Sequence, residues 1–218
     1  MIYEPVTVPP IFEGLHVRGF FTNRHFDVPL SNVYLPIQKH TDKVIVLEHD
    51  LDPMIGDAVV TNRSDIMIGI QVADCVPILL FDAERNVVGA VHAGWRGTAE
   101  GILKNTIAAM TDRFCSSPSG LRVAIGPSIK KCCYCVGHEV IEAVIRTTGA
   151  GDYAVEIGDS KYYLDLAAAN KYQAESMGIP PGHIWTSAEC TFCLPEKYYS
   201  YRFAKGTTGR QYGIIGII

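Results

Sequence analysis

The sequence lacks any apolar run of the roughly 18 to 20 residues that a membrane-spanning helix needs. Its opening stretch, MIYEPVTVPPIFEG, has neither the basic nor the apolar region of a secretion signal. Basic residues are not in excess either: 19 Lys and Arg stand against 23 Asp and Glu, and the formal net charge is −4. This balance gives no basic face for nucleic acid. We therefore expect a cytoplasmic protein whose partner is a small molecule rather than a membrane or a nucleic acid.

Cysteine is well represented, with an odd number of residues and no export signal, which favours thiols and metal thiolates over a disulfide framework. The seven are Cys75, Cys115, Cys132, Cys133, Cys135, Cys190 and Cys193. Two Cys-x-x-Cys pairs, 132/135 and 190/193, are separated by 190 − 135 − 1 = 54 residues. Compact zinc sites use a gap of roughly 15 to 20 residues. The spacing therefore favours buried thiols, and a second metal site is the alternative.

Short apolar and β-branched runs fill the first part of the chain, separated by Pro, Gly, Asn and Asp. They predict strands at residues 15–22, 32–37, 44–50, 57–61, 66–72, 76–82 and 86–93. Helical patterns occur at 98–114, 137–148 and 165–178, and further strand patterns at 121–126, 183–188, 198–203 and 211–218. Runs of strands with helices interspersed late favour an α+β fold over a regular βαβ alternation. We expect residues 1–218 to form a single domain, with a sandwich-like mixed β-sheet core and flanking helices.

Three potential metal ligands, His40, Cys75 and His92, lie at predicted strand edges next to turn-forming residues. Two imidazoles and one thiolate suit zinc at three protein positions and leave the fourth for water, as in catalytic zinc sites. The separations, 75 − 40 = 35 and 92 − 75 = 17 residues, match no short spacing motif. Spacing alone favours a structural interpretation, with His40 in a surface loop, Cys75 as a small buried residue and His92 as a satisfied core histidine.

Seven segments that follow one another along the chain favour a metal site over this structural interpretation. They are QKH (38–40), ADCVPILL (73–80), HAGWRGT (92–98), AIGPSIKKCCYCVGHEV (124–140), DLAAANKYQ (165–173), ECT (189–191) and SYRFAKGTTGRQ (200–211). Together they resemble the multicopper polyphenol oxidase (laccase-domain) family, also described as zinc-dependent purine nucleoside phosphorylases of the same fold. The resemblance implies that the metal ligands are His40 of Gln-x-His, Cys75 of Ala-Asp-Cys and His92 of His-Ala-Gly-Trp-Arg-Gly.

The function implied by this resemblance is phosphorolysis of adenosine, inosine, guanosine or methylthioadenosine at one zinc ion per chain. The same zinc would activate water to deaminate adenosine. In the segment GAVHAGWRGT (89–98), the charge of Arg96 and the N–H groups of Gly97 and Thr98, near the start of a predicted helix, are candidates for holding phosphate. Arg202 and Arg210 are further candidates for phosphate or substrate contacts.

Two residues have roles that the sequence leaves open. Gln38 is a candidate for orienting His40 or the purine base. Asp74 is either an acid/base group beside the metal or a structural hydrogen-bonding residue. Because neighbouring residues of a strand point to opposite faces, Asp74 shares a pocket with Cys75 only if the strand has ended or bulged there.

Other functions also remain open. Two histidines and a cysteine are the ligand set of a blue-copper site, so a copper-dependent polyphenol oxidase is one alternative. A four-copper laccase needs paired histidines, and none of the seven histidines forms a His-x-His pair. A metal-free hydrolase, with Cys75 as nucleophile and His92 as base, is another alternative. A nonenzymatic binding module would leave the clustered ligands unexplained. The preferred purine and the oligomeric state do not follow from the sequence.

Overall fold

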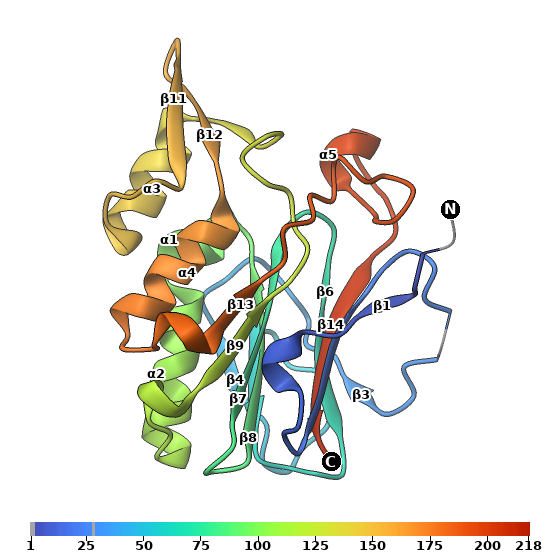
Figure 1. The fold of residues 1–218 in the computed structure, drawn as a ribbon. Helices are drawn as coiled ribbons and strands as arrows, with labels where there is room; N and C mark the ends of the chain where they lie inside the picture. The colour runs from blue at the N-terminus through green and yellow to red at the C-terminus, as the bar shows by residue number, and fades with distance from the viewer. Residues whose placement is uncertain (1–2, 28) are drawn as a thin grey trace.

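A computed structural model describes residues 3–27 and 29–218, and its core is two mixed β-sheets packed face to face (Figure 1). One sheet has the order β1 (Val6–Thr7), β2 (Val17–Thr22), β14 (Gln211–Ile217), β6 (Met67–Val72), β3 (Val33–Tyr34). The other has the order β13 (Ile184–Thr186), β9 (Arg122–Ile125), β7 (Val76–Asp82), β8 (Val87–Ala93), β5 (Ala58–Thr61), β4 (Val44–Val46). The predicted α+β fold with a sandwich-like mixed core is confirmed.

Both sheets are mixed because each combines antiparallel and parallel pairs. The pairs β3/β6, β4/β5 and β9/β13 are parallel, whereas the long hairpin of β7 and β8 is antiparallel. A third, smaller sheet has the order β10 (Cys135–Gly137), β12 (Lys161–Leu164), β11 (Ala154–Gly158). The sequence analysis missed the hairpin of β11 and β12, in which four of the five residues of β11 are exposed, so no apolar alternation marks it.

The central strands are buried on both faces, which explains their nearly continuous apolar sequences. In β7, Ile78 and Leu80 belong to the cluster that packs under the helices, and Leu79 and Phe81 belong to the cluster between the two sheets. This alternation follows from the two-residue period of a strand. The six-stranded sheet is therefore the middle layer of the molecule, between the five-stranded sheet and the helices (Figure 1).

The helices are α1 (Trp95–Glu100), α2 (Ile102–Phe114), α3 (His138–Thr148), α4 (Leu166–Ser176) and α5 (Tyr201–Ala204). Three short 3-10 turns begin with proline: η1 (Pro10–Phe12), η2 (Pro118–Gly120) and η3 (Pro181–His183). The predicted helices at 137–148 and 165–178 are confirmed as α3 and α4, and the Asp165 side chain caps α4 by accepting a hydrogen bond from the Ala168 N–H at 3.0 Å. No helix in the described ranges combines the length and apolar character needed to cross a membrane.

Two predicted elements differ from the structure. The helix expected at 98–114 begins earlier, at Trp95, and Gly101 divides it into α1 and α2 by taking a left-handed conformation with φ 78°. The strand expected at 198–203 is wrong. The Ser200 side chain accepts a hydrogen bond from the Phe203 N–H at 3.1 Å, which starts the short helix α5 instead.

Candidate active site

His40, Cys75 and His92 converge at one end of the sheets. His40 lies in the loop before β4, Cys75 in the turn between β6 and β7, and His92 near the C-terminal end of β8. One potential ligand atom from each lies within 4.8 Å of the others. Sγ of Cys75 is 4.0 Å from Nε2 of His40, and the two imidazole rings meet edge to face with centroids 4.8 Å apart. The three predicted ligands are close enough to share one metal ion.

A fully buried carboxylate, Asp57, fixes both histidines. Its Oδ1 accepts hydrogen bonds from Nδ1 of His92 at 2.7 Å and from the backbone N–H of His40 at 3.0 Å. Its Oδ2 accepts from the backbone N–H groups of Lys39 and Thr41 at 3.1 and 2.7 Å. Burial by itself would raise the pKa of Asp57, but these hydrogen bonds, led by the one from His92, hold it well below its usual value. The pairing leaves Nε2 of His92 for a metal, an arrangement common at zinc sites.

The Cys75 thiol is electrostatically prepared to be a thiolate. Burial alone would raise its pKa, but the positive charge of His92 and the hydrogen bond with His40 lower it to about 6. Burial likewise opposes the charge on His92, but Cys75 and Asp57 raise its pKa to about 9. A thiolate is the form in which cysteine binds metals or attacks an electrophile.

Asp74 and Cys75 face the same pocket because the strand has already ended. Asp74 lies in the turn between β6 and β7 with a positive φ of 81°. Its Oδ1 accepts a hydrogen bond from the Thr191 hydroxyl at 2.6 Å, and its Oδ2 accepts one from the backbone N–H of Arg202 at 2.7 Å. Both carboxylate oxygens of Asp74 accept hydrogen bonds from the protein, which favours a structural role over an acid/base role for this residue.

A hollow of about 850 Å³ opens beside the three ligands. This is within the range of about 300 to 1,000 Å³ typical of small-molecule pockets. Three aromatic side chains line it: Trp95, Tyr134 and Tyr201. Burial raises the pKa of Tyr134 to about 12, so its hydroxyl keeps its proton at neutral pH. The hollow combines a potential metal site with flat apolar surfaces.

The same hollow is lined by three of the predicted substrate-contact residues, Arg96, Arg202 and Arg210. The guanidinium carbon of Arg96 lies 4.2 Å from the ring centroid of Trp95, and that of Arg202 lies 5.1 Å from the ring centroid of Tyr134. Within the described residues, none of these guanidinium groups pairs with a carboxylate. The pocket therefore carries positive charge that an anion can neutralise.

Gly97 and Thr98 are not among the residues that line this pocket, and the prediction that the Thr98 backbone amide presents an anion site requires correction. The Gly97 N–H lies in the first turn of α1, and its part in anion binding stays a prediction. Because α1 begins at Trp95, the Thr98 N–H lies inside the helix and donates to the Gly94 carbonyl at 2.8 Å. The Thr98 hydroxyl accepts a hydrogen bond from Nδ2 of Asn170 at 2.9 Å. Both Gly97 and Thr98 are buried and serve the packing of α1.

Gln38 lines the pocket, but its predicted role of orienting His40 is not what the structure shows, whereas the alternative of orienting the purine base stays a prediction. Its Nε2 donates to the Gln71 carbonyl at 2.9 Å, and its Oε1 accepts from the Gln71 N–H at 2.9 Å. The side chain thus extends the hydrogen bonding of β6. The orienting role belongs to Asp57, which contacts His40 directly.

Asp57 and Tyr134 are two site residues that are not predicted from the sequence. Asp57 directly precedes the apolar run of β5, and a carboxylate next to a buried strand requires a buried partner, so this signal was present. Tyr134 gave no comparable signal, since only the folded chain brings it against Arg202.

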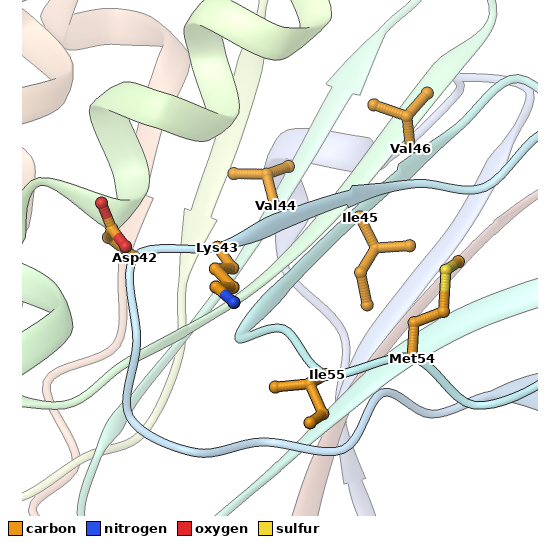
Figure 2. A pocket seen from close by; sticks show the side chains of 7 residues that line it. All are labelled: Asp42, Lys43, Val44, Ile45, Val46, Met54 and Ile55. Carbon is orange, nitrogen blue, oxygen red and sulfur yellow. The ribbon is translucent and has the colours of Figure 1, made fainter.

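A second hollow, of about 510 Å³, lies beside the edge strand β4 (Figure 2). Figure 2 shows mainly apolar side chains there, contributed by β4 and by Met54 and Ile55. Asp42 and Lys43 are its two charged residues, and none of the metal-ligand candidates lines it. The chemistry-bearing residues gather at the larger hollow.

Comparison with known proteins identifies relatives of this chain. A family model described as multi-copper polyphenol oxidoreductase laccase matches residues 20–218. Purine nucleoside phosphorylase YlmD of Geobacillus stearothermophilus is 37% identical over 163 residues, which cover 73% of this chain and 59% of that protein. A purine nucleoside phosphorylase of Aquifex aeolicus is 39% identical, with 76% of this chain and 74% of that protein covered. Adenosine deaminase RL5, from an unknown prokaryotic organism, is 34% identical, with 85% and 75% covered.

Solved structures show the same fold. The crystal structure of YlmD from Geobacillus stearothermophilus superposes with a TM-score of 0.92 at 26% identity, covering 100% of this chain and 97% of that one. The crystal structure of the Bacillus licheniformis hypothetical protein YfiH gives a TM-score of 0.87 at 25% identity, covering 99% and 100%.

Proposed function

This chain belongs to the multi-copper polyphenol oxidoreductase laccase family, and we propose that it is a zinc-dependent purine nucleoside phosphorylase with adenosine deaminase as a second activity. One observation carries the proposal: the ligand set of His40, Cys75 and His92 borders a pocket that also holds three arginines without carboxylate partners among the described residues. Its substrates would be adenosine, inosine, guanosine or methylthioadenosine together with inorganic phosphate.

The donor set fits zinc. Two imidazole nitrogens and one thiolate sulfur would hold zinc at three positions, and all three of these residues line the pocket. When bound, zinc would supply a Lewis acid that polarises a substrate group in the pocket. With Nδ1 of His92 paired to Asp57, Nε2 would be the ring nitrogen available to zinc.

The arginines suit the anionic co-substrate. In phosphorolysis, an oxygen of hydrogen phosphate bonds to the ribose C1′ while the bond from C1′ to the purine nitrogen breaks. The purine leaves with the electron pair of that bond and takes up the proton that hydrogen phosphate gives up. Arg96, Arg202 and Arg210 would bind the phosphate and place its oxygen for attack. Tyr201, an exposed aromatic residue of the pocket lining, offers a ring face against which a purine can stack.

Deamination of adenosine would use the same pocket without phosphate. Water adds at C6 of the purine and ammonia leaves, so the nucleoside contacts suffice and no arginine–phosphate contact is needed. The similarity to a protein named adenosine deaminase supports this second activity. We place the enzyme in the cytoplasm, where its seven cysteines, all free in the structure, would stay reduced.

A copper-dependent oxidase is the alternative suggested by the family description. The ligand set also suits a single copper. In the described residues, the two clusters that offer metal ligands are this one and a group of four cysteines, and neither supplies the paired histidines of a multicopper centre.

A metal-free hydrolase has one observation in its favour, a Cys75 sulfur and a His92 imidazole nitrogen that lie within 4.8 Å of each other. The pKa of the thiol is lowered beside His92. Removal of the metal separates this candidate from the zinc enzyme. A hydrolase that uses the thiolate as nucleophile keeps its activity in a chelator, whereas the proposed enzyme loses it and regains it when zinc is returned.

The test is an assay of the purified chain with inosine across phosphate concentrations, with release of hypoxanthine as the readout. We expect phosphate-dependent cleavage in the wild type, and loss of both cleavage and zinc from this site in Cys75→Ala. Cys115→Ala is the matched control, because Cys115 is an exposed cysteine outside the metal-ligand clusters. Phosphate-independent turnover of inosine, or oxidation of phenols only after copper loading, would refute the proposal.

A further inference from the structure

Four cysteines outside the pocket gather into a second cluster: Cys132, Cys133, Cys190 and Cys193. All four Sγ atoms lie within 4.8 Å of one another, and Sγ of Cys193 is 3.7 Å from that of Cys132 and 3.3 Å from that of Cys133. Zinc bonds of about 2.3 Å to four thiolates in a tetrahedron separate the sulfurs by about 3.8 Å. The cluster therefore has the dimensions of a four-thiolate zinc site.

The cluster differs from the sequence interpretation in membership and burial. The pair 132/135 was expected as a unit, but Cys135 begins strand β10 and lies outside the cluster, and Cys133 takes its place. Interpretation of these cysteines as buried thiols is also wrong, because only Cys190 is buried and Cys132 and Cys193 are exposed. Exposed thiols in contact have no packing reason to gather, whereas a metal ion provides one.

Two turns present the sulfurs, as in compact zinc sites. In the first turn, the N–H groups of Cys133 and Tyr134 both donate to the Lys130 carbonyl at 3.0 Å. In the second, the Leu194 N–H donates to the Cys190 carbonyl at 3.2 Å. The two turns are held side by side by a parallel bridge between Ser128 and Cys190.

The surroundings suit the net negative charge of a zinc ion with four thiolates. The backbone N–H of Lys130 donates to Sγ of Cys190 at 3.4 Å. Burial lowers the pKa of the Lys130 ammonium group, and the charges of Asp165, Cys190 and Cys132 act in the opposite direction. N–H donors and a nearby cation stabilise ligated thiolates in the same way that outer contacts support other metal ligands.

We propose that Cys132, Cys133, Cys190 and Cys193 bind a structural zinc ion that clamps the turn at 130–133 to the turn at 190–193. Binding releases the thiol protons and involves no change of oxidation state. This zinc is separate from the ion at His40, Cys75 and His92, and the inference holds whatever the substrate of the pocket is.

The clamp would act on the pocket through its neighbours. Tyr134 follows Cys133 directly and lines the pocket. Thr191 follows Cys190 and donates to Asp74, which in turn accepts from the Arg202 N–H. The zinc would thus fix two walls of the pocket to each other.

The test is a zinc count by elemental analysis and native mass spectrometry on the full chain, purified under reducing conditions with zinc supplied. We expect two zinc ions per chain in the wild type, one in Cys75→Ala and one in Cys193→Ser. The double variant should hold none. Cys115→Ser, which changes a cysteine outside both clusters, should keep two.

A spectroscopic readout covers the case in which Cys193→Ser fails to fold. Cobalt bound to Cys75→Ala should show the intense sulfur-to-metal charge transfer and visible bands of a tetrahedral four-thiolate centre. Zinc should also protect four thiols of that variant from alkylation until a chelator is added. Absence of zinc from Cys75→Ala, iron in the cluster, or a disulfide among these cysteines after purification under reducing conditions would overturn the proposal. None of these results bears on phosphorolysis at the first site.

Discussion

Oδ1 of Asp57 lies 2.7 Å from Nδ1 of His92, and both side chains are buried. The same oxygen accepts the backbone N–H of His40, so one carboxylate orients two of the three proposed ligands. His40 itself has a left-handed backbone with φ 58°, a conformation uncommon for residues other than glycine. The hydrogen bonds to Asp57 are what hold the loop in this shape, and they make the ligand geometry depend on a residue that touches no substrate.

Asp57→Asn should weaken zinc binding at the first site. The asparagine amide carries no charge to balance the imidazole, and its NH2 group cannot accept a hydrogen bond. Two backbone N–H groups that now donate to Asp57 would therefore lose their acceptor. Loss of such an outer partner typically costs about 10- to 100-fold in metal affinity. Competition with a chromogenic chelator measures the affinity. Asp65→Asn, which changes a surface carboxylate paired with Arg63, is the control, and equal affinities in the two variants would refute the positioning role.

Gly94→Ala should disturb the same site by steric contact. A Cβ at Gly94 would lie 3.1 Å from Cδ2 of His40 and 3.2 Å from Sγ of Cys75, closer than side chains normally approach. The backbone, with φ −72° and ψ 175°, accepts alanine without strain, so the fold should persist. We expect zinc affinity to fall about tenfold or more. Gly182→Ala meets nothing within 4 Å and should bind zinc as the wild type does; unchanged affinity in Gly94→Ala would show that the two ligands move aside freely.

Arg96→Ala should separate the two proposed activities. Loss of a charge-assisted contact to phosphate costs about 1.5 to 3 kcal/mol, which corresponds to roughly a 10- to 150-fold loss in phosphorolysis. The KM for phosphate should rise more than that for the nucleoside, and adenosine deamination in phosphate-free buffer should suffer less. Arg96→Lys should restore only part of the loss, because lysine keeps the charge without the planar fork.

The control for this measurement is Arg85→Ala, which removes an exposed arginine from the turn between β7 and β8. Equal losses of both activities in Arg96→Ala, with zinc still bound, would mean that Arg96 shapes the pocket or binds the nucleoside.

Asp74→Asn should leave most of the activity intact. An amide can accept from the Arg202 N–H and donate to the Thr191 oxygen, so both hydrogen bonds of the carboxylate survive in altered form. We expect kcat to fall less than tenfold, whereas removal of a general acid or base would cost about 10² to 10⁴. Asp74→Ala, which leaves the Arg202 N–H without a partner, should lower the melting temperature. A large drop of kcat in Asp74→Asn, with stability unchanged, would instead identify an acid/base group.

Much of the fold and of the candidate site could be predicted from the sequence. The apolar runs predicted the buried strands, and Asp165 predicted the start of α4 through its capping hydrogen bond. The motifs predicted His40, Cys75 and His92 as one ligand set, and the structure brings them together. The strands and the helix cap depend on residue type and on neighbours a few positions away, which a sequence displays directly. The ligand set was predictable only through the resemblance of its three motifs to a known family.

The tertiary structure decided what depends on distant segments. Asp57 reaches His92 because β5 pairs with β8, and Asp74 faces the pocket because β6 ends before it. Thr98 lies inside α1 because the helix begins at Trp95. The cysteine cluster combines the adjacent pair Cys132 and Cys133 with residues about 60 positions away in the sequence. A parallel bridge between two turns brings these cysteines together, and their spacing in the sequence does not predict it. Such pairings are fixed by strand register and packing across the whole core, and no local pattern encodes them.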